Sequence, residues 1–248
     1  MDLEWIATLE RASHTAVPAA RTAFDGPFLL RGFLGGTGRA NAVSALDPAP
    51  DPALETRLPR IEAAYARLGL PARFRSTPLD PPGLEAALLR RGYRPDSETA
   101  VMAGPLEGFA APDAALEILP APDPDWLAIL ATAEYQTPQR RAEKQEAAAM
   151  MMVPAAWLLL RIEGRPAASG QVAADGPLLG FFDIATDPAF RRRGLGRRLL
   201  AAAADWGQSR GAVTGWLQVS ATNAAAMNLY EALGFREVYR YRYFLRAG

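Results

Sequence analysis

The sequence predicts an α/β fold in which two similar units follow one another along the chain. Strand-like and helix-like segments alternate in both halves. The proline-rich stretch "LEGFAAPDAALEILPAPDPDW" separates the halves. Two segments, "EAALLRRGYR" and "NLYEALGFRE", each place an apolar helix before glycine, an aromatic residue and arginine. Two helices with ordinary glycine caps would explain this similarity alone, but the similar order of elements favours a duplicated architecture.

The first predicted unit spans residues 1–110, with a boundary near Ala111. Strands are expected in "FLLRGF", "ANAVSAL", "ARFRS" and "ETAVMAG". A helix is expected in "LETRLPRIEAAYARLGL", where Leu58, Ile61, Tyr65 and Leu68 share a face, and another in "PGLEAALLRRGY".

The second predicted unit spans residues 111–248, and "ALEIL" could be its first strand. Helical "DWLAILATAEY" and the polar "TPQRRAEKQEAAAMMM" follow, and then come three strand-like runs. The last two runs are joined by Asp175-Gly176, a strong hairpin signal. A long helix is expected from about Gly194 to Gly207, before strand "TGWLQVS", helix "NAAAMNLYEALG" and strand "REVYRYRYFL".

The composition excludes several classes of functional site. The chain has 248 residues, 50% of them hydrophobic, and a formal net charge of zero, which argues against a protein that binds a polyanion over its whole surface. It has no cysteine, which excludes disulfides, a thiolate nucleophile and cysteine-ligated zinc. The single histidine, His14, argues against a Ser-His-Asp triad or a multi-histidine metal site, and we expect it on the surface or at a helix end.

No export or membrane signal is evident. The N-terminal "MDLEWIATLERASH" has helical spacing and acidic residues but no apolar core of the kind that signal peptides carry. The longest apolar run is divided by Pro154. The default expectation is a cytoplasmic protein.

One segment points to a ligand. In "IATDPAFRRRGLGRRLLAAAADW" a strand ends at Thr186, and Arg-x-x-Gly-x-Gly opens a helix at Arg191–Gly196. Gly194 and Gly196 let the backbone approach a ligand, and free N–H groups and the helix dipole favour an anion such as a phosphate. The pattern is neither a Walker loop nor a dinucleotide fingerprint. A basic helix start without a ligand and a nucleic-acid patch are the alternatives.

The glycine loop is followed by a helix, a strand and a second helix that carries Asn223 and Tyr230. This order of elements is more specific than the glycine loop alone. "FFDIATDPAFRRRGLGRRLL" followed by "WLQVSATNAAAMNLYEALGF" resembles the GNAT superfamily of acyl-CoA-dependent N-acyltransferases, and most of all its ribosomal-protein N-terminal acetyltransferases. The resemblance covers roughly Glu117 to the C-terminus. It implies a mixed, mostly antiparallel sheet flanked by helices. The first unit resembles the degenerate half of tandem members; it has "GGTGRAN" but no Arg-x-x-Gly-x-Gly helix start, so we do not expect it to bind CoA.

The resemblance implies a role for each matching residue. Tyr230 would protonate the departing thiolate, and Asn223 would hydrogen-bond the cofactor from the start of the same helix face, almost two turns away. Without a ligand, Asn223 reads as a plain N-cap and Tyr230 as a core aromatic. The remaining predicted cofactor contacts are the backbone of the acyl-binding strand and the pyrophosphate loop: Ile184, Ala185, Thr186, Arg191, Arg192, Arg193, Gly194, Leu195, Gly196 and Arg197.

Gln218 departs from the resemblance. The N-terminal acetyltransferases that this segment resembles usually have a glutamate, the proposed general base, where this chain reads "WLQV". An amide cannot accept a proton in the useful pH range, but it can orient a water or the amine. Asp183 is a weak alternative because strand alternation turns it away from Ile184 and Thr186. Glu134 and Tyr135 are candidates for acceptor contacts, and no base is assigned.

The acceptor-side helices give little guidance. The charges in "AEYQTPQRRAEKQEAAAMMM" are expected on a solvated face, and Met150, Met151 and Met152 in the core or on a malleable apolar wall.

The predicted function is acetyl transfer from acetyl-CoA to a primary amine, by direct attack and with no metal. The alternatives are a non-catalytic acyl-CoA sensor or scaffold and, more weakly, a nucleic-acid-binding protein. We expect no nucleic-acid or membrane partner, and either a monomer with an internal pseudo-dimer or a homodimer.

Overall fold

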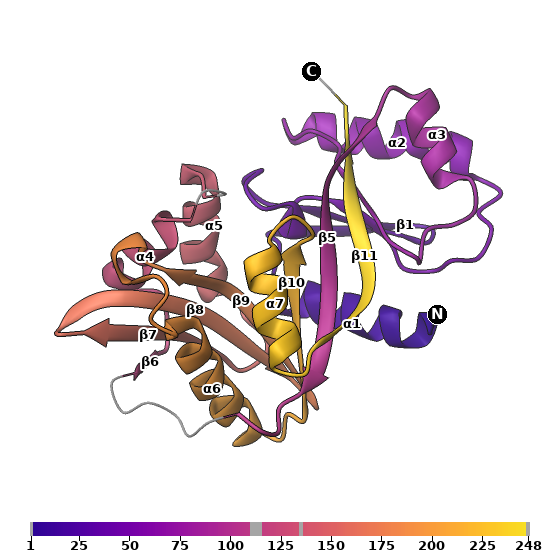
Figure 1. The fold of residues 1–248 in the computed structure, drawn as a ribbon. Helices are drawn as coiled ribbons and strands as arrows, with labels where there is room; N and C mark the ends of the chain where they lie inside the picture. The colour runs from indigo at the N-terminus through magenta and orange to yellow at the C-terminus, as the bar shows by residue number, and fades with distance from the viewer. Residues whose placement is uncertain (1, 110–115, 134–135, 247–248) are drawn as a thin grey trace.

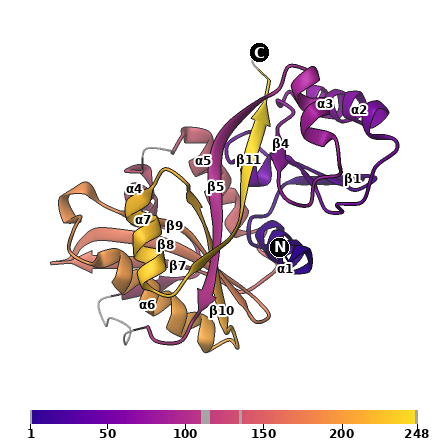
Figure 2. The same cartoon turned by 45° about the vertical axis from the view of Figure 1, so that its right-hand side comes forward.

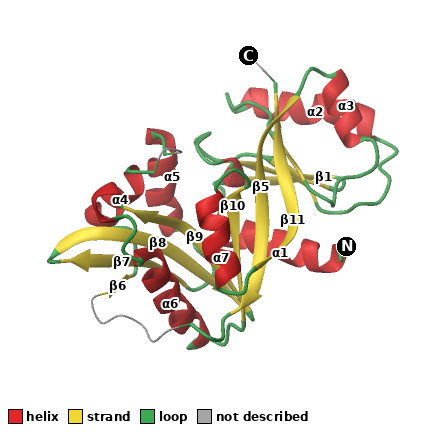
Figure 3. Ribbon diagram, viewed as in Figure 1, coloured by secondary structure: helices red, strands yellow, loops and turns green. Residues whose placement is uncertain are grey.

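The computed structural model describes residues 2–109, 116–133 and 136–246 (Figure 1). Seven α-helices and eleven strands lie in these ranges (Figure 3). The helices are α1 (Leu3–Ala16), α2 (Leu54–Arg67), α3 (Leu84–Arg90), α4 (Pro124–Ala131), α5 (Pro138–Ala148), α6 (Leu195–Gln208) and α7 (Ala224–Ala232), with 3-10 turns η1 (Gly38–Ala40) and η2 (Pro188–Phe190). The strands are β1 (Arg21–Asp25), β2 (Phe28–Gly32), β3 (Val43–Ala45), β4 (Phe74–Ser76), β5 (Arg94–Pro105), β6 (Leu116–Leu119), β7 (Ala155–Ile162), β8 (Arg165–Asp175), β9 (Leu178–Thr186), β10 (Thr214–Ser220) and β11 (Arg236–Leu245).

All eleven strands form one sheet in the order β1-β2-β3-β4-β11-β5-β10-β9-β8-β7-β6. Pairing is antiparallel except between β3 and β4 and between β9 and β10. The predicted α/β architecture, a mixed and mostly antiparallel sheet with helices on its faces, is therefore confirmed. Within the described ranges, no helix combines the length and apolar character needed to cross a bilayer.

The two halves exchange their last strands. β5 belongs to the first half, β1–β5, yet it lies between β10 and β11 of the second half, with Val101 opposite Gln218. In return β11 lies between β4 and β5, with Phe244 opposite Phe74. The two long strands run side by side through the middle of the molecule (Figures 1 and 2). Each half therefore completes its sheet with a strand of the other.

An internal pseudo-two-fold relation follows from the order of pairings. Apart from the additional edge strand β6, each half shows two antiparallel pairs, one parallel pair and then the exchanged strand: β1-β2-β3-β4-β11 and β7-β8-β9-β10-β5. The two similar segments, "EAALLRRGYR" and "NLYEALGFRE", occupy equivalent positions in the two halves. Gly92 and Gly234 have positive φ values of 84° and 89°, and each follows a helix and precedes a buried aromatic, Tyr93 or Phe235. The predicted duplication is visible at this level of detail.

The local signals explain most elements. In α2, Leu54, Leu58, Ile61 and Tyr65 recur at helical spacing and are buried, each Leu or Ile side chain stabilising by about 1.5–3 kcal/mol. Placing Leu68 on that face was wrong, because the helix ends at Arg67 and Leu68 is 43% exposed. The hairpin predicted from Asp175-Gly176 joins β8 to β9, with Asp175 opposite Leu178.

Helix α1 belongs to the first half in sequence but packs on the sheet of the second. Its apolar face, including Ile6 and Leu9, shares a core with Phe182 of β9 and Trp216 of β10. His14 lies in its last turn, as expected of a helix-end residue, but is half-buried and accepts a hydrogen bond from Arg31 at 3.0 Å. Burial lowers the pKa of His14 to about 3, so the imidazole is neutral near pH 7.

The boundary predicted near Ala111 lies outside the described residues. The strand expected in "ALEIL" is present as β6, at the edge of the sheet beside β7.

Candidate active site

A cleft opens where β9 and β10 diverge. The two strands pair in parallel from Leu178 and Thr214 only as far as Phe181 and Leu217. Beyond that point a cleft of about 380 Å³ separates them, within the range of small-molecule sites. It is lined from β9, β10, α7, α5, β5, β11 and the loop before β3: Thr37, Gly38, Arg39, Ser97, Thr99, Arg140, Phe181, Phe182, Asp183, Ile184, Leu217, Gln218, Val219, Ser220, Asn223, Ala226, Tyr230, Tyr241 and Tyr243.

A bulge in β9 shapes one wall of the cleft. The pairing with β8 jumps from Phe182 opposite Gln171 to Ala185 opposite Ser169, and Asp183 has a positive φ of 52°. Within the described residues, the β10 side of this stretch has no strand partner beyond Phe181. Ile184 lines the cleft, whereas Ala185 packs into the core beneath α4. The backbone at which an acyl-CoA was predicted to bind is thus an unpaired strand edge.

The glycine loop follows directly after this edge. Thr186 ends β9, and η2 leads to Gly194, which has a φ of 72° and forms the N-cap of α6. No side chain caps this helix, and the first bond back to the cap comes from Arg198 N–H to Gly194 O at 3.2 Å. The N–H groups of the first turn are therefore available to an anion. The predicted arginines, Arg191, Arg192, Arg193 and Arg197, are all exposed around it.

Helix α7 brings Asn223 and Tyr230 to the cleft. Asn223 is the N-cap: its Oδ1 accepts a hydrogen bond from Ala226 N–H at 3.1 Å, which leaves its amide NH₂ for a ligand. Tyr230 is 8% exposed and packs near Phe235, with ring centroids 6.2 Å apart. Both residues line the same cleft, so the capping and core interpretations are compatible with a binding role.

Gln218 is held at both ends of its amide. Its Oε1 accepts a hydrogen bond from Tyr241 Oη at 2.9 Å, and its Nε2 donates to Ser13 Oγ at 2.8 Å. These contacts join β10 to the exchanged strand β11 and to α1. The geometry fits a positioning residue, and the amide has no capacity to act as a base.

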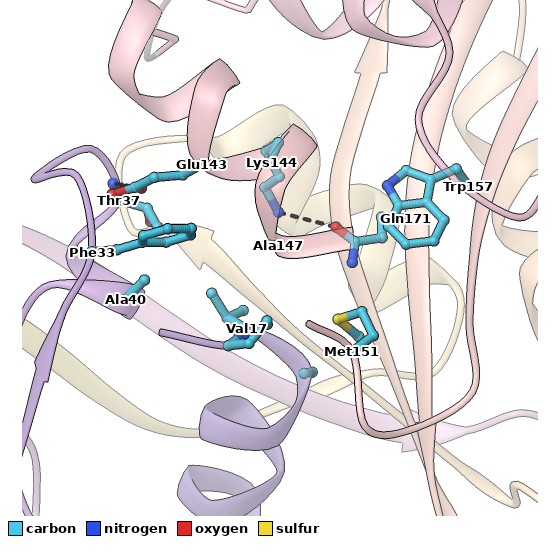
Figure 4. A pocket seen from close by; sticks show the side chains of 12 residues that line it. Val17, Phe33, Thr37, Ala40, Glu143, Lys144, Ala147, Met151, Trp157 and Gln171 are labelled. Atoms are coloured by element: carbon cyan, nitrogen blue, oxygen red, sulfur yellow. Dashed lines mark hydrogen bonds between the residues drawn. The ribbon is translucent and has the colours of Figure 1, made fainter. Parts of the chain in front are cut away.

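The expectation of a solvated charge face on α5 holds for Glu146 but was wrong for Glu143 and Lys144. Glu143 is 2% exposed, and the side chain of Lys144 is 11% exposed. Lys144 forms a close ion pair with Asp183 and donates a hydrogen bond to Gln171 Oε1 at 3.0 Å (Figure 4). Burial alone would raise the pKa of Asp183, but Lys144 and Arg39 more than offset it and hold that pKa below its usual value. Asp183 is therefore a buried carboxylate and a poor base.

Glu143 fastens a loop of the first half to the second half. Its carboxylate accepts hydrogen bonds from the N–H groups of Leu34 (3.0 Å), Gly36 (2.9 Å) and Thr37 (2.6 Å). The amide of Asn41 donates a fourth bond at 2.7 Å. A side chain at Gly36 would lie 2.6 Å from Glu143 Oε2, so the loop needs glycine at this position. No local pattern indicates this contact, because a glutamate in a highly charged helix is normally expected to face solvent.

Beside this contact lies a small pocket (Figure 4). Its volume of about 20 Å³ suits about one water molecule. Met151 lines it, Met150 packs against the neighbouring core, and Met152 is 91% exposed. The methionine run therefore divides between core and solvent.

Two expected acceptor contacts, Glu134 and Tyr135, lie outside the described residues. In the described ranges, no three His, Asp or Glu side chains gather as metal ligands.

Comparisons with known proteins agree with this geometry. The family model described as "Probable histone acetyltransferase Rv0428c C-terminal" matches residues 5–244. The [Ribosomal protein bS18]-alanine N-acetyltransferase of Salmonella typhimurium is 61% identical over 56 residues, which are 23% of this chain and 38% of that protein. The uncharacterized N-acetyltransferase YobR of Bacillus subtilis is 26% identical over 245 residues, 96% of this chain and 97% of its own length.

Solved structures share the fold. A GCN5-related N-acetyltransferase from Kribbella flavida has a TM-score of 0.74 at 20% identity and covers 98% of this chain and 95% of its own. A tandem GNAT protein from the clavulanic acid biosynthesis pathway has a TM-score of 0.63 at 13% identity, over 95% of this chain and 86% of its own. With the family match over nearly the whole chain, the protein belongs to the GNAT N-acetyltransferase family.

Proposed function

We propose that the protein transfers an acetyl group from acetyl-CoA to a primary amine. The observation that carries the proposal is the continuity of two features: an unpaired strand edge at Ile184–Thr186 and, directly after it, the uncapped N-terminus of α6. An extended ligand with a diphosphate at one end fits this sequence of sites. The backbone of β9 would pair with its amide arm, and the first turn of α6 with the arginines would hold the diphosphate.

The chain's own residues would divide the chemistry. The acceptor nitrogen bonds to the acetyl carbon, the carbon–sulfur bond breaks, and the nitrogen's surplus proton leaves to solvent. Backbone N–H groups near Thr186 would stabilise the oxyanion. Tyr230 would donate its phenolic proton to the departing thiolate and recover a proton from solvent, and Asn223 would hold the ligand from the start of the same helix. No side chain of the cleft is assigned as a base, since Gln218 is an amide and Asp183 is ion-paired.

The test is Tyr230→Phe, which removes only the hydroxyl. We expect thiol release over a panel of amines to fall about 100-fold or more, with the affinity for acetyl-CoA measured by calorimetry unchanged. Binding of acetyl-CoA without thiol release in the unmodified protein would instead favour a sensor or scaffold, an alternative supported by Gln218, an amide at the position where a glutamate base is expected. If neither acetyl-CoA nor CoA binds, the proposal fails.

A further inference from the structure

The side of the cleft that an acceptor would reach is built partly by the first half of the chain. Thr37, Gly38 and Arg39, from the loop between β2 and β3, line it together with Ser97 and Thr99 of β5. Phe182 and Gln218 belong to the sheet face covered by α1, whereas Asn223 and Tyr230 come from α7 over the opposite face. The cleft thus passes between the strands. A cofactor held by α6 and α7 leaves the first-half side for the amine.

The first-half wall is held in place before any ligand arrives. The four hydrogen bonds to Glu143 fix the backbone just before Arg39. The carbonyl of Arg39 accepts a hydrogen bond from Arg31 Nη1 at 2.7 Å, which fixes its own backbone. A preorganised cation costs less conformational entropy when it binds a ligand than one on a mobile loop.

The guanidinium of Arg39 lacks a full set of acceptors. It lies 5.5 Å from the ring centroid of Phe182 and 3.6 Å from Asp183 Oδ1, which is too long for a hydrogen bond. Among the described residues it makes no hydrogen bond, although its side chain is only 17% exposed. Arginine presents five donors in a planar fork that suits carboxylate and phosphate oxygens. Beyond its 3.6 Å ion pair with Asp183, this partly buried guanidinium has donors that suit an anionic ligand.

The surrounding charges do not neutralise this cation. Asp183 is engaged by Lys144 in a closer ion pair, so these two charges largely cancel each other. Glu143 is occupied by the loop N–H groups, whose hydrogen bonds disperse its charge. The local field therefore favours an anionic substrate and disfavours a polycationic one.

Arg39 lies close to the proposed position of the acyl group, so a ligand group bound by Arg39 would also lie close to it. Arg39 contacts Phe182 and Asp183, and Asp183 directly precedes Ile184, where the acyl group is proposed to lie. The diphosphate loop begins beyond Thr186, three residues and about 10 Å further along the strand from Asp183. Arg39 is thus placed beside the acceptor and away from the diphosphate.

We propose that the acceptor is an amine with an acidic group, carboxylate or phosphate, a few bonds from its nitrogen, and that Arg39 binds this group. The inference rests on the proposed acetyl transfer and names its substrate class. Arg39 would select and orient the acceptor without exchanging a proton.

The test uses matched amines with the full-length protein. Phenylalanine, phenylalaninamide and phenethylamine share a skeleton and differ in the acidic group; O-phosphoethanolamine and ethanolamine form the phosphate pair. Thiol release at saturating acetyl-CoA gives kcat/KM, and calorimetric titration into CoA-saturated protein gives affinity without turnover. We expect the acidic member of at least one series to exceed its neutral partners at least about tenfold in both, and the series that does so distinguishes carboxylate from phosphate.

Variants assign this preference to Arg39. Arg39→Gln should abolish it, mainly by raising KM for the acidic amine, and Arg39→Lys should restore part of it. Arg11→Gln, at an exposed position on α1, is the matched control and should keep the full preference. Far-ultraviolet circular dichroism and the melting temperature would show that the variants are folded.

Several results would overturn the inference. The inference is wrong if, in the intact protein, acidic amines neither bind nor react better than their neutral partners. It is also wrong if a lysine-rich histone-tail peptide reacts faster than every acidic amine. A preference that survives Arg39→Gln would overturn it as well. In any of these cases, thiol release with another amine would leave the acetyl-transfer proposal intact, whereas failure to bind acetyl-CoA would remove both.

Discussion

The helix that connects the two parallel strands begins among different charges in the two halves. In the second half, α6 starts at Gly194 without a side-chain cap and among exposed arginines. In the first half, the counterpart α2 starts after Asp51, whose Oδ1 accepts a hydrogen bond from Ala53 N–H at 3.0 Å. Arg57 pairs with Asp51 at 2.7 Å, and Glu55 lies in the first turn. Neither helix has a side-chain cap, but the start of α6 is surrounded by arginines, whereas the start of α2 carries the acidic side chains of Asp51 and Glu55.

A second difference lies one helix further on. Tyr93 N–H bonds to Leu88 O, and Phe235 N–H bonds to Tyr230 O, both at 3.0 Å, so Leu88 is the counterpart of Tyr230. The first half has an apolar side chain where the second has the proposed acid. The comparison indicates that one backbone arrangement can carry the proposed binding site in one half and lack its side chains in the other, through a few residues in and around two helices.

Separating the halves should have the largest effect. Residues 1–110 and 111–248 as individual polypeptides would each lose the strand that the other half inserts, leaving long unpaired edges inside the sheet. We expect each to be unfolded or aggregated, and co-expression to restore a soluble complex. Circular dichroism and size-exclusion chromatography check this. A second half that unfolds cooperatively as a monomer on its own would show that the exchange is dispensable.

Making the start of α6 acidic, as in α2, tests the contrast directly. A Cβ at Gly196 would meet Leu229 Cδ2 at 3.5 Å, an ordinary contact, and a carboxylate in a first helical turn is favourable for the helix. Gly196→Glu should therefore keep or raise the melting temperature while weakening acetyl-CoA binding about 100-fold or more.

Gly196→Ala is the control for this change, since it adds the Cβ without the charge. Calorimetric titration of both variants separates charge from shape. An equal loss of acetyl-CoA affinity in the two variants would mean that the added Cβ, and not the negative charge at the helix start, weakens binding.

The tie between the halves should be visible in stability. Glu143→Ala leaves the N–H groups of the loop at Gly36 and Thr37 unpaired in a buried setting, and we expect a loss of about 3 kcal/mol in the free energy of unfolding. Glu146→Ala, on the exposed side of the same helix, should change it by less than about 0.5 kcal/mol. Denaturant titration measures both. Similar losses in the free energy of unfolding for the two variants would contradict a stabilising role of Glu143 between the halves.

The sequence predicted best what is encoded locally. The order strand, glycine loop, helix, strand, Asn-helix-Tyr was readable because each motif is contiguous, and the structure brings Ile184, Asn223 and Tyr230 to one cleft. The strand exchange was not predicted, since periodicity defines a strand but not its partner more than a hundred residues away.

Buried charges were the other omission. Glu143 and Lys144 were expected in solvent because charged residues are rarely buried without partners. Their partners, the loop N–H groups and Asp183, come from distant parts of the chain, so no local pattern reveals them.

Hydrogen–deuterium exchange with and without acetyl-CoA tests the central claim most directly, because it locates the binding half without any mutation. The account predicts protection of the β9 edge and the start of α6, residues 184–198, and of residues 223–230 in α7, with no change at the start of α2. Protection at residues 51–58, or at both helix starts, would contradict the division of roles between the halves.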